Sequence, residues 1–152
     1  MSYVSDIRAK IGHAALMLVS AAVLIARGDE VLLMRRSDNG LWGYHGGAVE
    51  PGETVEEAAR RELYEESGLT AGKMRLFAVS SGPSQHVYYP NGDEVYYTEV
   101  LYLCEDYTGE PLRSNEEVLE QRWFALACLP ESISPSLMPQ LHQYAAGRIA
   151  GL

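Results

Sequence analysis

Three glutamates stand close together in a segment that predicts a helix. Glu62, Glu65 and Glu66 occupy positions i, i+3 and i+4, and at about 100° per residue such positions share one side of an α-helix. Like charges at these spacings destabilise a helix by ~0.2–0.5 kcal/mol per pair, so a compensating charge is expected. Carboxylates are the hard oxygen ligands that Mg²⁺ or Mn²⁺ prefers, and these ions also bind substrate phosphates. The spacing favours a metal site over the alternative, a solvated acidic surface.

The same side of this helix carries apolar residues toward its N-terminus. Val55, Ala58 and Ala59 lie on it, and an apolar stripe of this kind normally faces the protein core. Arg61 lies four residues before Glu65 and can neutralise only part of the acidic charge. A divalent cation is therefore the better counter-charge.

The helix that presents these glutamates has clear signals at both ends. No helix breaker occurs from Thr54 to Ser67, and Gly68 stands where a left-handed residue commonly ends a helix. Thr54 and Glu57 have the spacing of a capping box, in which each side chain accepts from the other residue's backbone N–H. Just before this helix, the glycine-rich residues 46–53 supply backbone that can approach a ligand closely.

Together, the glycine-rich segment and the helix resemble the Nudix box. That motif is a glycine, five residues, a glutamate, seven residues, and then Arg-Glu-apolar-any-Glu-Glu-any-Gly-apolar. Here it reads Gly47, Glu53 and the run from Arg61 to Leu69, and every defined position matches. The chain departs from many members at Tyr44-His45, where they carry Leu-Pro.

The resemblance implies an α+β fold of the Nudix type, an α/β/α sandwich with a mixed β-sheet, and hydrolysis of a nucleoside diphosphate linked to a moiety X. It implies Mg²⁺ as the cofactor, with Mn²⁺ as a substitute. The implied metal ligands are Glu62, Glu66, Glu65 and the Gly47 carbonyl, and the implied catalytic residues are Glu65, Arg61 and Glu53. In this family the arginine orients the carboxylates, and its five fixed donors suit that task better than a lysine.

A further carboxylate is expected from outside the box, because an attacking water needs a group that accepts its proton or a second metal that activates it. Relatives place such a group in a loop before a late strand, and in this chain Glu117 has about that position. Glu116 and Glu120 are the second and third candidates, and all three could be solvated loop charges. If none of them acts, Glu53, Glu65 or Glu99 is next.

The rest of the chain alternates between apolar runs and turn signals. It predicts one domain over residues 1–152. Residues 106–109 are most simply a turn, and residues 90–93 form a hairpin turn. Strands are expected over 16–26, 30–36, 75–80, 86–89, 95–104 and 121–124, and further helices over 3–11 and 136–149.

The composition excludes several other classes of protein. Twelve Lys and Arg against 21 Asp and Glu give a net charge of −9, which disfavours a nucleic-acid partner. The apolar run 14–26 is too short to span a membrane, and the turn after it predicts a strand rather than a targeting segment. Cys104 and Cys128 lack metal-ligand spacing and are expected to be buried thiols. A cytoplasmic protein with a small nucleotide as partner is expected, alone or as a homodimer.

Weaker signals concern His45, which could contact a phosphate, and Trp42, Tyr88 and Tyr89, which could stack on a nucleobase. Glu99 lies mid-strand and could point into a cleft. The leading hypothesis is a pyrophosphohydrolase of nucleoside triphosphates, oxidised ones included, or of ADP-ribose-like compounds. The alternatives are a nucleotide-binding module without turnover, which usually has eroded glutamates, and an isoprenoid diphosphate isomerase, which needs a cysteine and glutamate constellation not identified in this chain.

Overall fold

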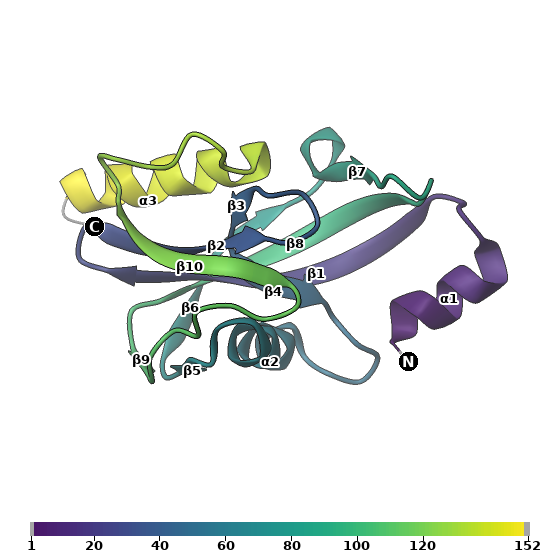
Figure 1. Ribbon diagram of the computed structural model, residues 1–152, viewed down its shortest axis with the longest axis horizontal. Coiled ribbons are helices and arrows are strands. Elements are labelled where there is room, and N and C mark those ends of the chain that lie inside the picture. Colours follow the sequence, from purple (N-terminus) through teal and green to yellow (C-terminus); the bar gives the residue numbers. More distant parts are fainter. Residues whose placement is uncertain (1, 151–152) are drawn as a thin grey trace.

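The computed structural model describes residues 2–150 and shows a curled β-sheet between two helices (Figure 1). Helix α3 covers one face of the sheet and helix α2 covers the other, while α1 lies beside one end. This is the mixed sheet between helices that the sequence predicts. The helices are α1 (Tyr3–Ile11), α2 (Val55–Ser67) and α3 (Met138–Ala150), with short 3₁₀ turns η1 (Pro83–Gln85) and η2 (Pro135–Leu137).

The sheet is mixed because one central pair of strands is parallel. Within the described part of the chain, the strand order is β10-β2-β1-β8-β6; β1 pairs with β8 in parallel and with its other partners antiparallel. The strands are β1 (Leu16–Arg27), β2 (Glu30–Arg36), β3 (Trp42–Gly43), β4 (His45–Ala48), β5 (Thr70–Ala71), β6 (Met74–Ser80), β7 (His86–Tyr88), β8 (Glu94–Cys104), β9 (Tyr107–Thr108) and β10 (Val118–Ala125).

Strand β1 changes partners along its length. Its end, residues 25–27, pairs with β2, whereas its middle, residues 20–23, pairs with β4. The sheet therefore divides between β2 and β4, and Glu66, near the end of α2, accepts a hydrogen bond from Gly46 of β4. This split brings helix side chains and sheet side chains to one cleft.

Two apolar cores hold the helices against the sheet. On the α3 side, Leu24, Leu101 and Leu103 of β1 and β8 pack with Leu141. On the α2 side, the core includes Ala58, Ala59 and Leu63 of the helix, all at 0% exposure. Burying a side chain such as Leu63 stabilises the fold by ~1.5–3 kcal/mol, so the face of α2 that precedes the glutamates is anchored firmly.

Helix α2 begins and ends where the sequence predicts. The Thr54 hydroxyl accepts from the Glu57 amide at 3.1 Å, and the Glu57 carboxylate accepts from the Thr54 amide at 2.8 Å. At the other end Gly68 has φ 77°, a conformation that costs glycine little and other residues more. The glutamates are thus carried by a helix with fixed limits.

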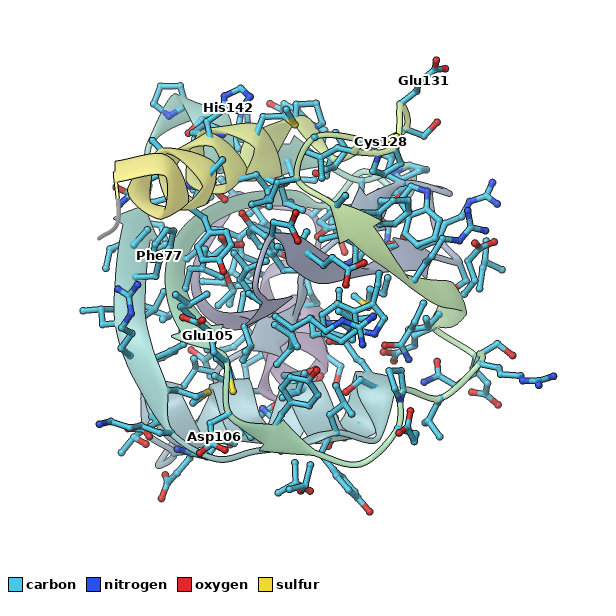
Figure 2. All side chains as sticks on the ribbon, turned by 90° about the vertical axis from the view of Figure 1, so that its left-hand side faces the viewer. Phe77, Glu105, Asp106, Cys128, Glu131 and His142 are labelled. Carbon is cyan, nitrogen blue, oxygen red and sulfur yellow. The ribbon has the colours of Figure 1, made fainter. Side chains whose placement is uncertain are left out.

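The other predicted helices and strands are confirmed with shifts of a few residues at their ends. Residues 106–109 are not simply a turn, because β9 pairs there with β5, and the glycine-rich segment contains β3 and β4. The expectation that both cysteines are buried is wrong for Cys128, which is exposed and lies in the segment between β10 and α3 (Figure 2). Among the helices of residues 2–150, none is long and apolar enough to cross a membrane.

Candidate active site

Glu66 is the most enclosed of the three helix glutamates. Its side chain is buried, and its Oε1 accepts a hydrogen bond of 2.6 Å from the backbone N–H of Gly46 on β4. Burial raises the pKa of Glu66 to about 8, and the nearby charge of Glu62 adds to the rise. The fold therefore holds a carboxylate whose negative charge is poorly compensated, a position that a bound cation would stabilise.

Glu62 lies directly against Gly47. A Cβ built on Gly47 would be 2.6 Å from both the Cδ and the Oε1 of Glu62, closer than side-chain carbons ever approach. Only glycine leaves room for the carboxylate in this position. Burial is also the main reason that the pKa of Glu62 is raised, against the opposing effect of Arg61.

Arg61 ties the glycine-rich loop to the helix. Its Nε and Nη2 donate to the two carboxylate oxygens of Glu53 at 3.0 and 2.5 Å, and its Nη1 donates to Glu62 at 2.8 Å. Its Nη2 also donates to the Ala48 carbonyl at 3.2 Å. The Glu53 pair raises the pKa of Arg61 and lowers that of Glu53. A lysine, with one compact charge, could not make this set of contacts.

The glutamates face a cleft of about 610 Å³, a volume typical of small-molecule sites. Its wall includes Glu62, Glu65 and Glu66 from α2 and both Gly46 and Gly47 from β4. Glu65 is the exposed member and lies 3.5 Å from Arg61. The cleft extends from this acidic end across the sheet toward η2.

Glu117 lies on the wall of the same cleft. Its charge contributes to the raised pKa values of Glu62 and Glu66, so it faces them closely enough to repel them. Its loop is held by two bonds: the Asn115 side chain accepts from the Glu117 amide at 2.9 Å, and the Glu117 carbonyl accepts from the Ser37 amide at 3.0 Å. Of the three loop glutamates, it is the one that the fold brings to the other carboxylates.

The two alternative loop glutamates lie elsewhere. Glu116 is exposed and does not line the cleft. Glu120 forms ion pairs with Arg35 at 3.8 Å and Arg122 at 2.7 Å. Neither is placed to meet a ligand at the helix glutamates.

The donor set fits a hard divalent cation. Within residues 2–150, no three acidic, histidine or cysteine side chains form a ready-made metal cage, because Glu62 and Glu65 contact Arg61 and Glu66 accepts from Gly46. Mg²⁺ does not need such a cage, since it is usually held by one or two carboxylates together with waters and substrate phosphates. One buried carboxylate, Glu66, and one partly buried carboxylate, Glu62, both with raised pKa values beside an open cleft, meet that description.

Several weaker expectations do not hold. His45 is fully buried in β4, hydrogen bonded through Nε2 to Gln121 at 2.8 Å, and does not line the cleft; burial lowers its pKa to about 4. Trp42 is buried against Phe124, edge to face at 4.8 Å. Tyr88 is exposed and absent from the cleft wall, so Tyr89 is the expected stacking residue that reaches it.

The departure at Tyr44-His45 has a structural counterpart. The Tyr44 hydroxyl donates to the Leu137 carbonyl of η2 at 3.1 Å, and the His45 ring joins β4 to β10 through Gln121. Leucine and proline could form neither hydrogen bond. The two residues therefore anchor β4 from both faces of the sheet.

Sequence reasoning missed Arg36, which lies on the cleft wall. It donates from Nε and Nη2 to Asp38 at 2.9 and 2.8 Å, and this pair is the main reason for its raised pKa. The run Arg35-Arg36 at the end of a predicted strand was the available signal, but which of the two faces the cleft depends on the twist of β2.

Comparison with known proteins agrees with this geometry. A family profile for the NUDIX domain matches residues 17–144. The chain belongs to the Nudix family. A solved Nudix relative, the MutT NUDIX hydrolase from Burkholderia pseudomallei, is 29% identical, with a TM-score of 0.73 over 84% of this chain and 98% of that one.

Curated Nudix relatives carry different substrate names. An NAD-capped RNA hydrolase of Chromobacterium violaceum is 33% identical over 86% of this chain, which covers 46% of that protein's length. An oxidized purine nucleoside triphosphate hydrolase of Danio rerio is 34% identical over 72% of this chain and 67% of its own length. An ADP-ribose pyrophosphatase of Methanocaldococcus jannaschii is 34% identical over 71% of this chain and 62% of its own length. Family membership therefore does not select one substrate.

Proposed function

We propose that this Nudix protein is a divalent-metal-dependent pyrophosphohydrolase. Its substrate would be a nucleoside diphosphate linked to X, either a nucleoside triphosphate, oxidised ones included, or an ADP-ribose-like compound. The observation that carries this proposal is the meeting of Glu62, Glu65, Glu66 and Glu117 on the wall of one cleft. The names of two relatives, an oxidized purine nucleoside triphosphate hydrolase and an ADP-ribose pyrophosphatase, support the two substrate classes.

The acidic end of the cleft would hold Mg²⁺ or Mn²⁺ through Glu62 and Glu66, with Glu65 and the Gly47 carbonyl as further ligands. When bound, the ion neutralises the diphosphate and lowers the pKa of a coordinated water. Gly47 leaves the space in which the Glu62 carboxylate rests. The Gly46 amide fixes Glu66 from the opposite side.

Arg61 and Glu53 act as positioning residues. Their two-point pair joins the loop that carries Gly47 to the helix that carries Glu62. Arg36, on the wall near Glu66, has its Nη1 free of the Asp38 pair and is available to an anionic oxygen. These contacts hold the reacting phosphate and the ligands in one geometry before any chemistry occurs.

Glu117 would accept the proton of the attacking water or hold a second ion. It reaches the cleft from a loop rather than from α2, so it can face the side of the phosphate opposite the helix. Its position beside Glu62 and Glu66 supports this role. Glu117→Gln should lower turnover and change its pH profile, whereas Glu116→Gln and Glu120→Gln should not.

The test is a panel of nucleoside triphosphates, oxidised triphosphates and ADP-ribose with Mg²⁺, followed by product identification. Glu66→Gln should abolish most turnover, and Glu110→Gln serves as the matched control because it removes the same charge from an exposed residue that does not line the cleft. Absence of hydrolysis of every compound, together with binding of some of them, would instead identify a binding module without turnover.

A further inference from the structure

The cleft contains a second acidic feature that the proposed chemistry does not use. Glu99 lies in the middle of β8, is largely enclosed, and lines the cleft wall. In the described part of the chain no hydrogen bond or ion pair reaches its carboxylate, and burial is the cause of its raised pKa. An enclosed carboxylate without partners destabilises a fold unless a ligand satisfies it.

Glu99 lies at the opposite end of the cleft from the helix glutamates. It alternates with Leu101 and Leu103, which belong to the α3-side core, whereas α2 packs on the other face of the sheet. It pairs with Ser20 of β1, and Ser20 pairs with Ala48 of β4. Two strand spacings, roughly 10 Å, therefore separate it from β4. Glu99 is too distant to share an ion held beside Gly47.

Among residues 2–150, no positive group pairs with Glu99, and burial alone shifts its pKa. Two neutral groups of the cleft wall lie near it: Ser20 beside it on β1, and Tyr44, whose pKa is raised by burial and then by the charge of Glu99. The Tyr44 hydroxyl already donates to Leu137. A ligand that satisfies Glu99 must consequently bring hydrogen-bond donors, and two parallel N–H groups match the two oxygens of a carboxylate.

We propose that Glu99 selects the nucleobase and accepts the paired N1–H and N2–H groups of a guanine-type base. This rests on the proposed function, in which the diphosphate lies at the glutamates of α2; the sugar would then span the strands between the two ends. Guanine presents two adjacent donors on one edge, whereas adenine and cytosine present a donor beside an acceptor and uracil a donor between two acceptors. An ionised carboxylate therefore pairs fully with guanine alone.

The test measures binding without turnover. Wild type and Glu99→Gln are titrated by calorimetry with the α,β-methylene analogues of GTP, ATP, CTP and UTP in Mg²⁺. Wild type should bind the guanine analogue more tightly than the adenine analogue by roughly 10- to 100-fold, the range for one bidentate contact. The side-chain amide of the variant has an NH₂ group that donates and one oxygen that accepts. The variant should therefore lose this preference and bind the adenine analogue at least as well as wild type does.

Controls keep the outcomes separate. Glu110→Gln should leave the guanine preference unchanged. Glu99→Asp keeps both carboxylate oxygens, so it should still prefer the guanine analogue but bind it more weakly. Equal binding of all four analogues by wild type, or an unchanged guanine preference in Glu99→Gln, would overturn the proposal. Glu99-dependent guanine binding without hydrolysis of any triphosphate, oxidised triphosphate or ADP-ribose would uphold it while refuting the proposed pyrophosphohydrolase. Hydrolysis of all four triphosphates with equal kcat/KM would do the reverse.

Discussion

Gly47→Ala should remove most of the activity and leave the fold nearly intact. The added Cβ would lie 2.6 Å from the Cδ and Oε1 of Glu62 and 2.8 Å from its Oε2. Because non-bonded atoms settle at about 3.5–4.0 Å, the carboxylate must move by about 1 Å. It is the end of a flexible side chain, so it can swing away, but it then loses its 2.8 Å bond to Arg61.

The expected magnitudes differ for stability and activity. Gly47 does not have a positive φ, so alanine at this position reduces the entropy of the unfolded chain and contributes ~0.4–1 kcal/mol of stability. Losing the partly exposed Arg61–Glu62 pair costs ~0–1 kcal/mol. The net change should stay within about 1 kcal/mol, or ~2–4 °C in Tm for a chain of this size. A misplacement of about 1 Å in a metal ligand should lower kcat/KM by ~10²-fold.

The assay compares kcat/KM in Mg²⁺ and Tm for wild type, Gly47→Ala and a matched control. Gly147→Ala is that control, because a Cβ there meets nothing within 4 Å and α3 is remote from Glu62. Wild-type kcat/KM in a folded Gly47→Ala protein would refute the placement of Glu62 at the reacting centre. A fall in Tm of more than about 10 °C would show that the backbone rather than the carboxylate gave way.

Four further outcomes are expected. Excess chelator should abolish turnover and Mg²⁺ should restore it; full turnover in chelator would exclude the proposed chemistry. Glu66→Gln should lower turnover by orders of magnitude yet raise the metal-free Tm above about pH 8, where the buried wild-type carboxylate is charged; an active variant would place the ion elsewhere. Gly46→Ala should lower Tm strongly, because its Cβ would lie 2.6 Å from the backbone oxygen of Ala21, whereas Gly43→Ala meets nothing within 4 Å. Burial raises the pKa of Glu99 above its value in the unfolded chain. Wild type therefore loses stability as the pH rises from the unfolded pKa through the folded pKa. Glu99→Gln should have a higher Tm than wild type at about pH 8 and the same Tm at about pH 4; equal Tm values at both pH values would contradict this.

Helix α2 illustrates what could be predicted from the chain alone. Its start at Thr54, its end at Gly68 and the common side of its glutamates depend on residues within four positions of one another. Such relations hold wherever the segment is placed. The Nudix box from Gly47 to Leu69 also lies within one short segment, so it can be recognised without the fold. The family profile that matches residues 17–144 confirms the family that this motif indicates.

Tertiary structure decided which distant residues meet this helix. His45 stands next to the glycines in sequence, yet β4 turns its side chain into the interior, where it bonds to Gln121. Similarly, β9 exists only because residues 107–108 pair with residues 70–71. A pattern of polar and turn residues carries no information about such a distant partner, so the sequence alone predicts a turn there.

The amino-acid order by itself determined the identity and the spacing of the carboxylates that we propose as metal ligands, because helical periodicity is a short-range property. Only the fold decided that Glu117 and Arg36 face those carboxylates and that Glu99 occupies the other end of the same cleft. Those positions depend on the register of β8 against β1 and on the split of β1 between β2 and β4. Register is set by burial across the whole sheet, and a shift of one residue would turn Glu99 to the opposite face.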